Sequence, residues 1–186
     1  LAQAKYQVAA LEKKLEEFKY VKKPQLKTVE AGETVYLGAF SVEFIHVNHS
    51  IADSCALAIY TPVGTVLHSG DFKLDVTPID GEMMNVTRLG EIGKKGTLLL
   101  MCESTNAERP GHTPSEKKVG KSLENIFSAN KDKRIVIATF SSNVHRVQQI
   151  INCSHRYGRK VAVTGRSMQN IVEVATRLGY MDIPKG

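Results

Sequence analysis

A histidine and two aspartates, His49, Asp53 and Asp71, lie in the short polar segments that interrupt a run of β-rich sequence. Imidazole and carboxylate groups are suitable ligands for Zn²⁺ or Mn²⁺. Two metal ions can together bind a phosphodiester and lower the pKa of a water nucleophile. These residue types suit a metal-dependent hydrolase, but two ligands do not close a site that usually needs three or four. A hydrogen-bonded loop histidine with two turn-capping aspartates explains the same residues without a metal.

The predicted strands explain how these groups could meet. Residues 54–61 and 65–70 have the pattern of two apolar strands joined by a turn at Pro62-Val63-Gly64. A tight antiparallel hairpin brings its end back beside its beginning. We therefore expect Asp71 to return to the sheet edge that carries His49.

A further candidate, Glu103, follows a continuous apolar run over residues 97–102, which is typical of a central strand covered on both faces. The carboxyl ends of strands are where α/β proteins place ligands and catalytic groups. The alternative is a carboxylate paired with Arg109 or another surface cation, an arrangement that is common and contributes little.

Two turns in the second half of the chain carry hydroxyl, amide and basic side chains where helices are predicted to begin. Free N–H groups at a helix start favour an anionic oxygen, and an arginine guanidinium suits phosphate. The candidate anion-binding residues are Ser141, Ser142, Asn143, His145, Arg146 and Arg166. Plain helix capping is the commoner explanation for each turn taken alone.

Two regions of different character must position these groups. The first, to about residue 111, is expected to hold a helix over residues 4–20 followed by strands over 26–30, 34–37, 40–48, 54–61, 65–70 and 97–102. The second is expected to alternate helices over 114–130, 142–157 and 167–178 with strands over 134–140 and 160–164. Such alternation predicts a parallel sheet with right-handed crossovers.

Composition narrows the class of protein. The 186 residues include 25 basic and 19 acidic side chains, for a net charge of +6, which is compatible with a polyanionic partner. No apolar run is long enough to span a membrane. The three cysteines are far apart, so we expect buried, reduced thiols and no zinc ribbon.

Two stretches resemble motifs of the ribonuclease J family of metallo-β-lactamase/β-CASP nucleases. His49-Ser50-Ile51-Ala52-Asp53-Ser54 is similar to the family's His-Ser-Ile-Pro-Asp-Ser, with Ala52 in place of proline. Gly70-Asp71-Phe72-Lys73-Leu74-Asp75 is similar to its Gly-Asp-Phe-Lys-Phe-Asp. The resemblance, which covers essentially the whole chain, implies that His49 ligates one metal and that Asp71 bridges two and acts in catalysis.

The resemblance extends to the later candidates. The stretch that begins at Glu103 looks like the one with the first β-CASP motif, where aspartate is common, and this implies a supporting catalytic role for Glu103 near the metals. The turns at residues 139–146 and 164–168 are similar to turns that border the family's RNA channel. The six candidate anion-binding residues would accordingly contact RNA phosphate or sugar.

The fold implied by the resemblance is α/β. Residues 1–111 would form part of a metallo-β-lactamase αββα sandwich, and residues 112–186 the first part of a Rossmann-like β-CASP domain. The family's His-x-His-x-Asp-His motif would lie upstream and the later β-CASP motifs downstream. We therefore expect this chain alone to hold an incomplete metal site, to be inactive, and to self-associate or expose apolar surface.

The parent protein is accordingly expected to be a cytoplasmic bacterial ribonuclease with zinc, or manganese, in a two-metal site. By resemblance, it would cleave RNA 5′→3′ from a monophosphorylated end and also internally, within a homo- or hetero-oligomer of ribonuclease J-type subunits. Three alternatives stay open: a catalytically weak RNA-binding paralogue, a β-CASP nuclease for DNA or messenger RNA 3′ ends, and a nucleotide-binding module without metal. The run at residues 106–111 favours the bacterial ribonuclease branch, and the chain has no Gly-x-Gly-x-x-Gly fingerprint for the third.

Overall fold

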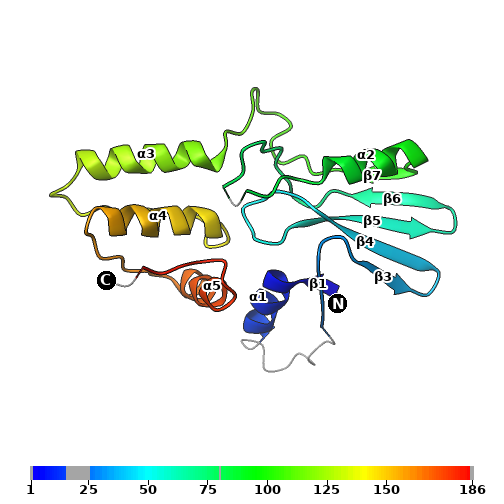
Figure 1. The fold of residues 1–186 in the computed structure, drawn as a ribbon, viewed down its shortest axis with the longest axis horizontal. Coiled ribbons are helices and arrows are strands. Elements are labelled where there is room, and N and C mark those ends of the chain that lie inside the picture. Colours follow the sequence, from blue (N-terminus) through cyan, green and yellow to red (C-terminus); the bar gives the residue numbers. More distant parts are fainter. Residues whose placement is uncertain (1, 16–25, 80, 185–186) are drawn as a thin grey trace. The chain divides into compact units, whose positions relative to one another are not determined.

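The computed structural model describes residues 2–15, 26–79 and 81–184, and the chain divides into two compact units. The first unit comprises residues 1–49, 53–76 and 82–113, and the second comprises residues 50–52, 77–81 and 114–186. Figure 1 shows that the first unit holds the strands and that the second is built on helices. The identity of the first unit as part of a metallo-β-lactamase domain stays a prediction.

A five-stranded mixed sheet frames the first unit, in the order β3-β4-β5-β6-β7. The strands are β3 (Thr34–Leu37), β4 (Phe40–His46), β5 (Cys55–Thr61), β6 (Gly64–His68) and β7 (Leu99–Met101). Strands β3 to β6 pair antiparallel, whereas β7 pairs parallel with β6. A separate parallel pair joins β1 (Ala2–Ala4) to β2 (Lys27–Val29). The strands predicted in this region are confirmed, with ends that differ by at most two residues.

Two helices belong to the first unit. Helix α1 (Lys5–Leu15) confirms the beginning of the predicted N-terminal helix, whose residues 16–20 lie outside the described residues. Helix α2 (Val86–Lys95) was not predicted, although Asn85 caps it by accepting a hydrogen bond from the backbone N–H of Arg88 at 3.0 Å. Of the helices in the described ranges, none combines the length and the apolar character that crossing a bilayer requires.

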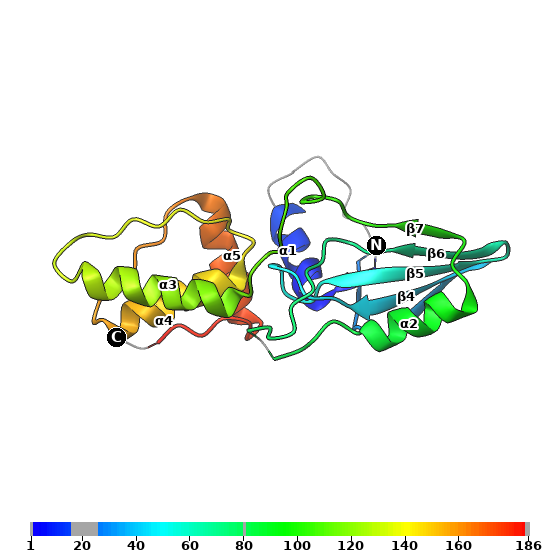
Figure 2. The same ribbon diagram turned by 90° about the horizontal axis from the view of Figure 1, so that it is seen from above.

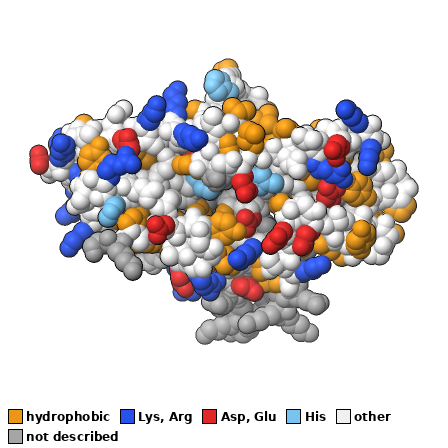
Figure 3. Space-filling view, in the orientation of Figure 1, with side chains coloured by type: hydrophobic (Ala, Val, Ile, Leu, Met, Phe, Trp, Pro, Cys, Tyr) orange, Lys and Arg blue, Asp and Glu red, His pale blue; other side chains and the backbone are white. Residues whose placement is uncertain are grey.

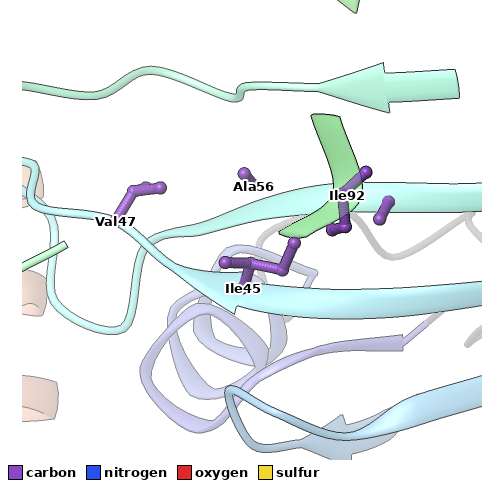
Figure 4. Packing of buried hydrophobic residues seen from close by; sticks show 5 residues of the cluster. Ile45, Val47, Ala56 and Ile92 are labelled. Carbon is purple, nitrogen blue, oxygen red and sulfur yellow. The ribbon is translucent and has the colours of Figure 1, made fainter. Parts of the chain in front are cut away.

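The alternation of side chains in β4 and β5 divides the core of the first unit between the two faces of the sheet. On one face, Ile45 and Ala56 pack against Ile92 of α2, as Figure 4 shows. On the other face, Phe44 packs with Val29 of β2. Helix α2 therefore covers one face of the sheet, as seen from above in Figure 2, and holds the central strands β4 and β5 in place.

The prediction that residues 97–102 form a central strand is wrong. Strand β7 lies at the edge of the sheet, and each of its three side chains is about half exposed. An apolar run identifies a strand but not its place in the sheet, which depends on how many neighbours bond to it, and among the described residues β7 has β6 alone. For the same reason Cys102 is exposed, contrary to prediction, whereas Cys153 is buried and Cys55 half-buried; all three thiols are free.

The second unit contains three helices that confirm those predicted. They are α3 (Glu116–Ala129), α4 (Val144–Arg156) and α5 (Arg166–Arg177). Helices α3 and α4 lie side by side in both ribbon views. They enclose a small core in which Leu123, Phe127 and Cys153 are buried.

The strands predicted over residues 134–140 and 160–164 are absent from the secondary structure of the described chain. Ile135 and Ile137 still pack against the helical core, while Val136 is 88% exposed. Strand-like alternation is thus retained, but a strand also requires a hydrogen-bonded neighbour. No backbone hydrogen bond joins these two segments among the residues that the structure describes.

Candidate functional site in the first unit

The carboxyl ends of three strands, β4, β6 and β7, lie at the same end of the sheet of the first unit. The register pairs His46 with Cys55, Leu57 with His68, and His68 with Met101. Because β4, β6 and β7 run in the same direction, their carboxyl ends lie together. The predicted hairpin is confirmed, and the loops that begin after these strands carry His49, Asp71 and Glu103.

Asn48 joins the first of these loops to the second. Its carbonyl oxygen accepts a hydrogen bond from the backbone N–H of Lys73 at 2.8 Å. Its side-chain amide accepts from the Met84 N–H at 2.9 Å and donates to the Glu82 carbonyl at 2.5 Å. Since Asn48 is buried and immediately precedes His49, these bonds hold the segment of His49 against the segment of Asp71.

Glu103 belongs to the same cluster of loops. Its carboxylate accepts a hydrogen bond from the backbone N–H of Thr105 at 2.7 Å. Hydrogen bonds from the Thr105 backbone and hydroxyl lower the pKa of the Glu103 carboxyl, and the charge of His49 lowers it further. Glu103 therefore adds negative charge to the end of the sheet where the metal ligands are predicted.

The glycine before Asp71 is required by its surroundings. Gly70 has φ +59°, and a Cβ atom on it would lie 2.9 Å from the carbonyl oxygen of Cys55. A side chain would strain the backbone and also collide with β5. Nδ1 of His68 accepts a hydrogen bond from the Gly70 N–H at 3.0 Å, so the tight turn into Asp71 is held on both sides.

Asp53 serves the fold in addition to lying near the loops. It is the one non-glycine residue with positive φ among those described, at +56°. Its Oδ2 accepts a hydrogen bond from the backbone N–H of Tyr6 at 3.1 Å, in the first turn of α1. A carboxylate at a helix N-terminus satisfies an otherwise unpaired donor and interacts favourably with the helix dipole. The partner is 47 residues away in sequence, so Asp53 caps a distant helix and not the local turn that the sequence alternative assigned to it.

His49 and Asp71 offer a nitrogen and a carboxylate donor of the kinds that zinc and manganese accept. No group of three His, Cys, Asp or Glu side chains able to hold a metal ion occurs within the part of the chain that the structure covers. The two donors thus fit as part of a ligand set, and further ligands would be needed to close it.

In the second unit, the two predicted turns meet. The hydroxyl groups of Ser141 and Ser167 are 2.9 Å apart and share a hydrogen bond. Asn143 is buried and caps α4, because its Oδ1 accepts from the Arg146 backbone N–H at 3.0 Å. The capping explanation therefore holds for Asn143.

Arg146 also has a partner within its own unit. Its Nη2 lies 2.7 Å from Oε1 of Glu116 on α3, and its Nε donates to the other carboxylate oxygen at 3.3 Å. The other candidates, Ser142, His145 and Arg166, lie at or next to the starts of α4 and α5. Lys and Arg side chains are interspersed with Asp and Glu on the face seen in Figure 3.

The structure adds three residues that sequence reasoning did not select: Asn48, Ser69 and, for its hydrogen bond to Gly70, His68. Each acts on backbone groups of a loop that carries a candidate ligand. Their position beside His49 and Asp71 was the available signal, but small polar loop residues have many ordinary roles.

A family model and two curated relatives that match this chain are all described as ribonuclease J. A family model described as "Ribonuclease J, beta-CASP domain" matches residues 132–186. The chain is 50% identical over 178 residues to Ribonuclease J of Synechocystis sp., with 95% of this chain and 28% of the relative covered. It is 40% identical over 184 residues to Ribonuclease J of Thermus thermophilus, with 97% and 32% covered. The chain therefore spans about a third or less of the length of these relatives.

The chain also matches a solved structure, described as a protein of unknown function from Enterococcus faecalis V583. The match covers 100% of this chain and 46% of the solved chain. The TM-score is 0.69 and the sequence identity is 19%. This likeness supports the fold alone.

Proposed function

Because the chain belongs to the ribonuclease J family, we propose that the protein is a metal-dependent nuclease that hydrolyses RNA phosphodiester bonds, both from a 5′ end and internally. The observation that carries the proposal is the convergence of three loops, with His49, Asp71 and Glu103, at one end of the sheet. The chain spans about a third of its relatives, so the activity would be that of the whole protein.

In this proposal His49 and Asp71 each supply a ligand to a two-metal site of zinc or manganese. When bound, such metals polarise a phosphodiester and lower the pKa of a water molecule. The carboxylate of Glu103, kept ionised by its hydrogen bonds from Thr105, adds negative charge that favours cations at this edge. Asn48 holds the His49 and Asp71 segments at a fixed separation.

The second unit would contribute contacts to the RNA backbone. Ser141, Ser142, His145 and Arg166 would face phosphate or sugar oxygens, as donors at helix starts are suited to do. We assign Asn143 and Arg146 chiefly to holding the turn, because Asn143 caps α4 and Arg146 pairs with Glu116.

The test is cleavage of a 5′-monophosphorylated RNA by the full-length protein after removal of metal with a chelator. Activity should disappear and return on addition of Mn²⁺ or Zn²⁺, and single-stranded DNA of the same sequence should be cut far more slowly. RNA binding without cleavage at any metal concentration would instead favour a non-catalytic RNA-binding paralogue. Equal cleavage of DNA would indicate a different branch of β-CASP nucleases.

A further inference from the structure

Ser69 connects two of the three loops through a single buried hydroxyl group. Its Oγ accepts a hydrogen bond from the backbone N–H of Glu103 at 3.0 Å. The same hydroxyl donates to the carbonyl oxygen of Gly70 at 2.6 Å. Its own backbone N–H donates to the Met101 carbonyl at 2.9 Å. Ser69 thus bonds to Gly70, next to Asp71, to Met101, the last residue of β7, and to Glu103, two residues beyond it.

The hydrogen bonds of Ser69 involve backbone groups that lie at or next to the two candidate functional residues. Gly70 directly precedes Asp71, and the N–H that Ser69 accepts belongs to Glu103 itself. Backbone groups so close to the functional side chains determine where those side chains begin. Because Ser69 is only 8% exposed, its loss would leave a donor and an acceptor without their partner in a protected place.

We propose that Ser69 is a positioning residue, whose hydroxyl fixes the separation of Asp71 and Glu103 and thereby sets the metal affinity of the site. The inference rests on the proposed function, since it assigns Asp71 to the metal. Groups that orient metal ligands without touching the metal typically change its affinity by about 10–100-fold when they are removed. The three hydrogen bonds of Ser69 all go to backbone groups, of Gly70, Met101 and Glu103, so its effect would act through the backbone.

The test compares wild type, Ser69→Ala and Ser69→Thr in the full-length protein, with Ser154→Ala as the matched control. Ser154 is a similarly buried serine on α4 of the second unit. Mn²⁺ affinity is measured directly by calorimetry on metal-free protein, and RNA cleavage is measured against Mn²⁺ concentration. We expect Ser69→Ala to weaken Mn²⁺ binding about tenfold and to raise the Mn²⁺ concentration for half-maximal cleavage similarly. Ser69→Thr, which keeps the hydroxyl, and Ser154→Ala should bind Mn²⁺ as wild type does.

Unchanged Mn²⁺ affinity in Ser69→Ala, or equal weakening in Ser69→Ala and Ser69→Thr, would overturn the positioning role. Wild-type protein that binds no Mn²⁺ and cleaves no RNA would instead contradict the proposed function. Hydrogen exchange of wild type gives a measurement that does not depend on the variants folding. The Glu103 amide should be protected from exchange, and free exchange would overturn the proposal even if Ser69→Ala could not be purified.

Discussion

The two units hold their candidate functional groups in different ways. In the first unit, backbone hydrogen bonds and the buried residues Asn48 and Ser69 join the loops that carry the candidate ligands. In the second unit, the hydroxyl groups of the half-buried Ser141 and the exposed Ser167 join the two turns, and Arg146 pairs with Glu116 of α3. Precise placement suits metal ligands, whereas a looser arrangement suffices for contacts to a flexible RNA backbone.

The largest expected difference between the units comes from glycine replacement. Gly70→Ala should destabilise the first unit by about 3 kcal/mol, because positive φ and a collision with the Cys55 carbonyl add together. Gly158→Ala in the second unit should cost only about 1 kcal/mol, since its φ is +63° but no atom lies within 4 Å of the new Cβ. Urea unfolding of both variants measures the difference. Equal costs would show that the Gly70 turn is less tightly enclosed than the structure indicates.

A smaller difference is expected for the ion pairs. Arg88 of α2 contacts both carboxylate oxygens of the buried Glu43, at 2.6 and 3.0 Å, and Tyr60 donates to the same carboxylate. Arg88→Ala leaves that carboxylate without its cation, so it should cost about 2 kcal/mol of unfolding free energy.

The control for this ion pair lies in the second unit. There Arg156 pairs with Glu124 in an exposed position, and Arg156→Ala should cost less than about 1 kcal/mol. Thermal and urea unfolding of the two variants would measure both costs. A loss for Arg156→Ala as large as that for Arg88→Ala would contradict the comparison.

The Glu43 contact also predicts a dependence on pH. The hydrogen bond from Arg88 holds the pKa of the Glu43 carboxyl below its ordinary value of 4.5, although burial opposes this. A lowered pKa stabilises the folded state above the ordinary value, and the stabilisation is lost as the pH falls through 4.5 and below. The unfolding free energy of the first unit should therefore decline in that range. Arg88→Ala should flatten the decline, and an unchanged slope would rule out this contact as its source.

The smallest expected effect concerns RNA binding by the second unit. Arg166→Ala should weaken RNA binding by the full-length protein several-fold and reduce the slope of log affinity against log salt by about one. Arg177→Ala, at the other end of α5, is the control and should leave both quantities unchanged. Equal effects of the two substitutions would indicate a general charge effect and not a contact at the turn.

Much of the first unit could be predicted from sequence because its strands pair with neighbours along the chain. The hairpin of β5 and β6 depends on a local turn, so alternation and turn residues suffice to place Asp71 near His49. Helix α2 was missed because it is short and contains Gly90 and Gly93, which lower helix propensity.

Other features depend on groups that are distant in sequence. Whether residues 134–140 form a strand, and whether β7 is a central or an edge strand, depends on which backbone segment lies beside each of them. The pattern of side chains along one segment does not identify that neighbour. For the candidate site, residue type was enough to select His49, Asp71 and Glu103. The roles of Asn48 and Ser69 could not be predicted, because they arise from backbone groups about 25 to 35 residues away that only the fold brings near.

The most direct test of the central claim is the metal content and Mn²⁺ affinity of the full-length protein with His49→Ala, compared with His155→Ala. His155 is an exposed histidine on α4 and serves as the matched control. If the three strand ends form a metal site, His49→Ala should lower Mn²⁺ affinity by more than about 100-fold, the upper end for residues that only support a ligand. His155→Ala should bind Mn²⁺ as wild type does. Wild-type affinity and metal content in His49→Ala would contradict the assignment of the site.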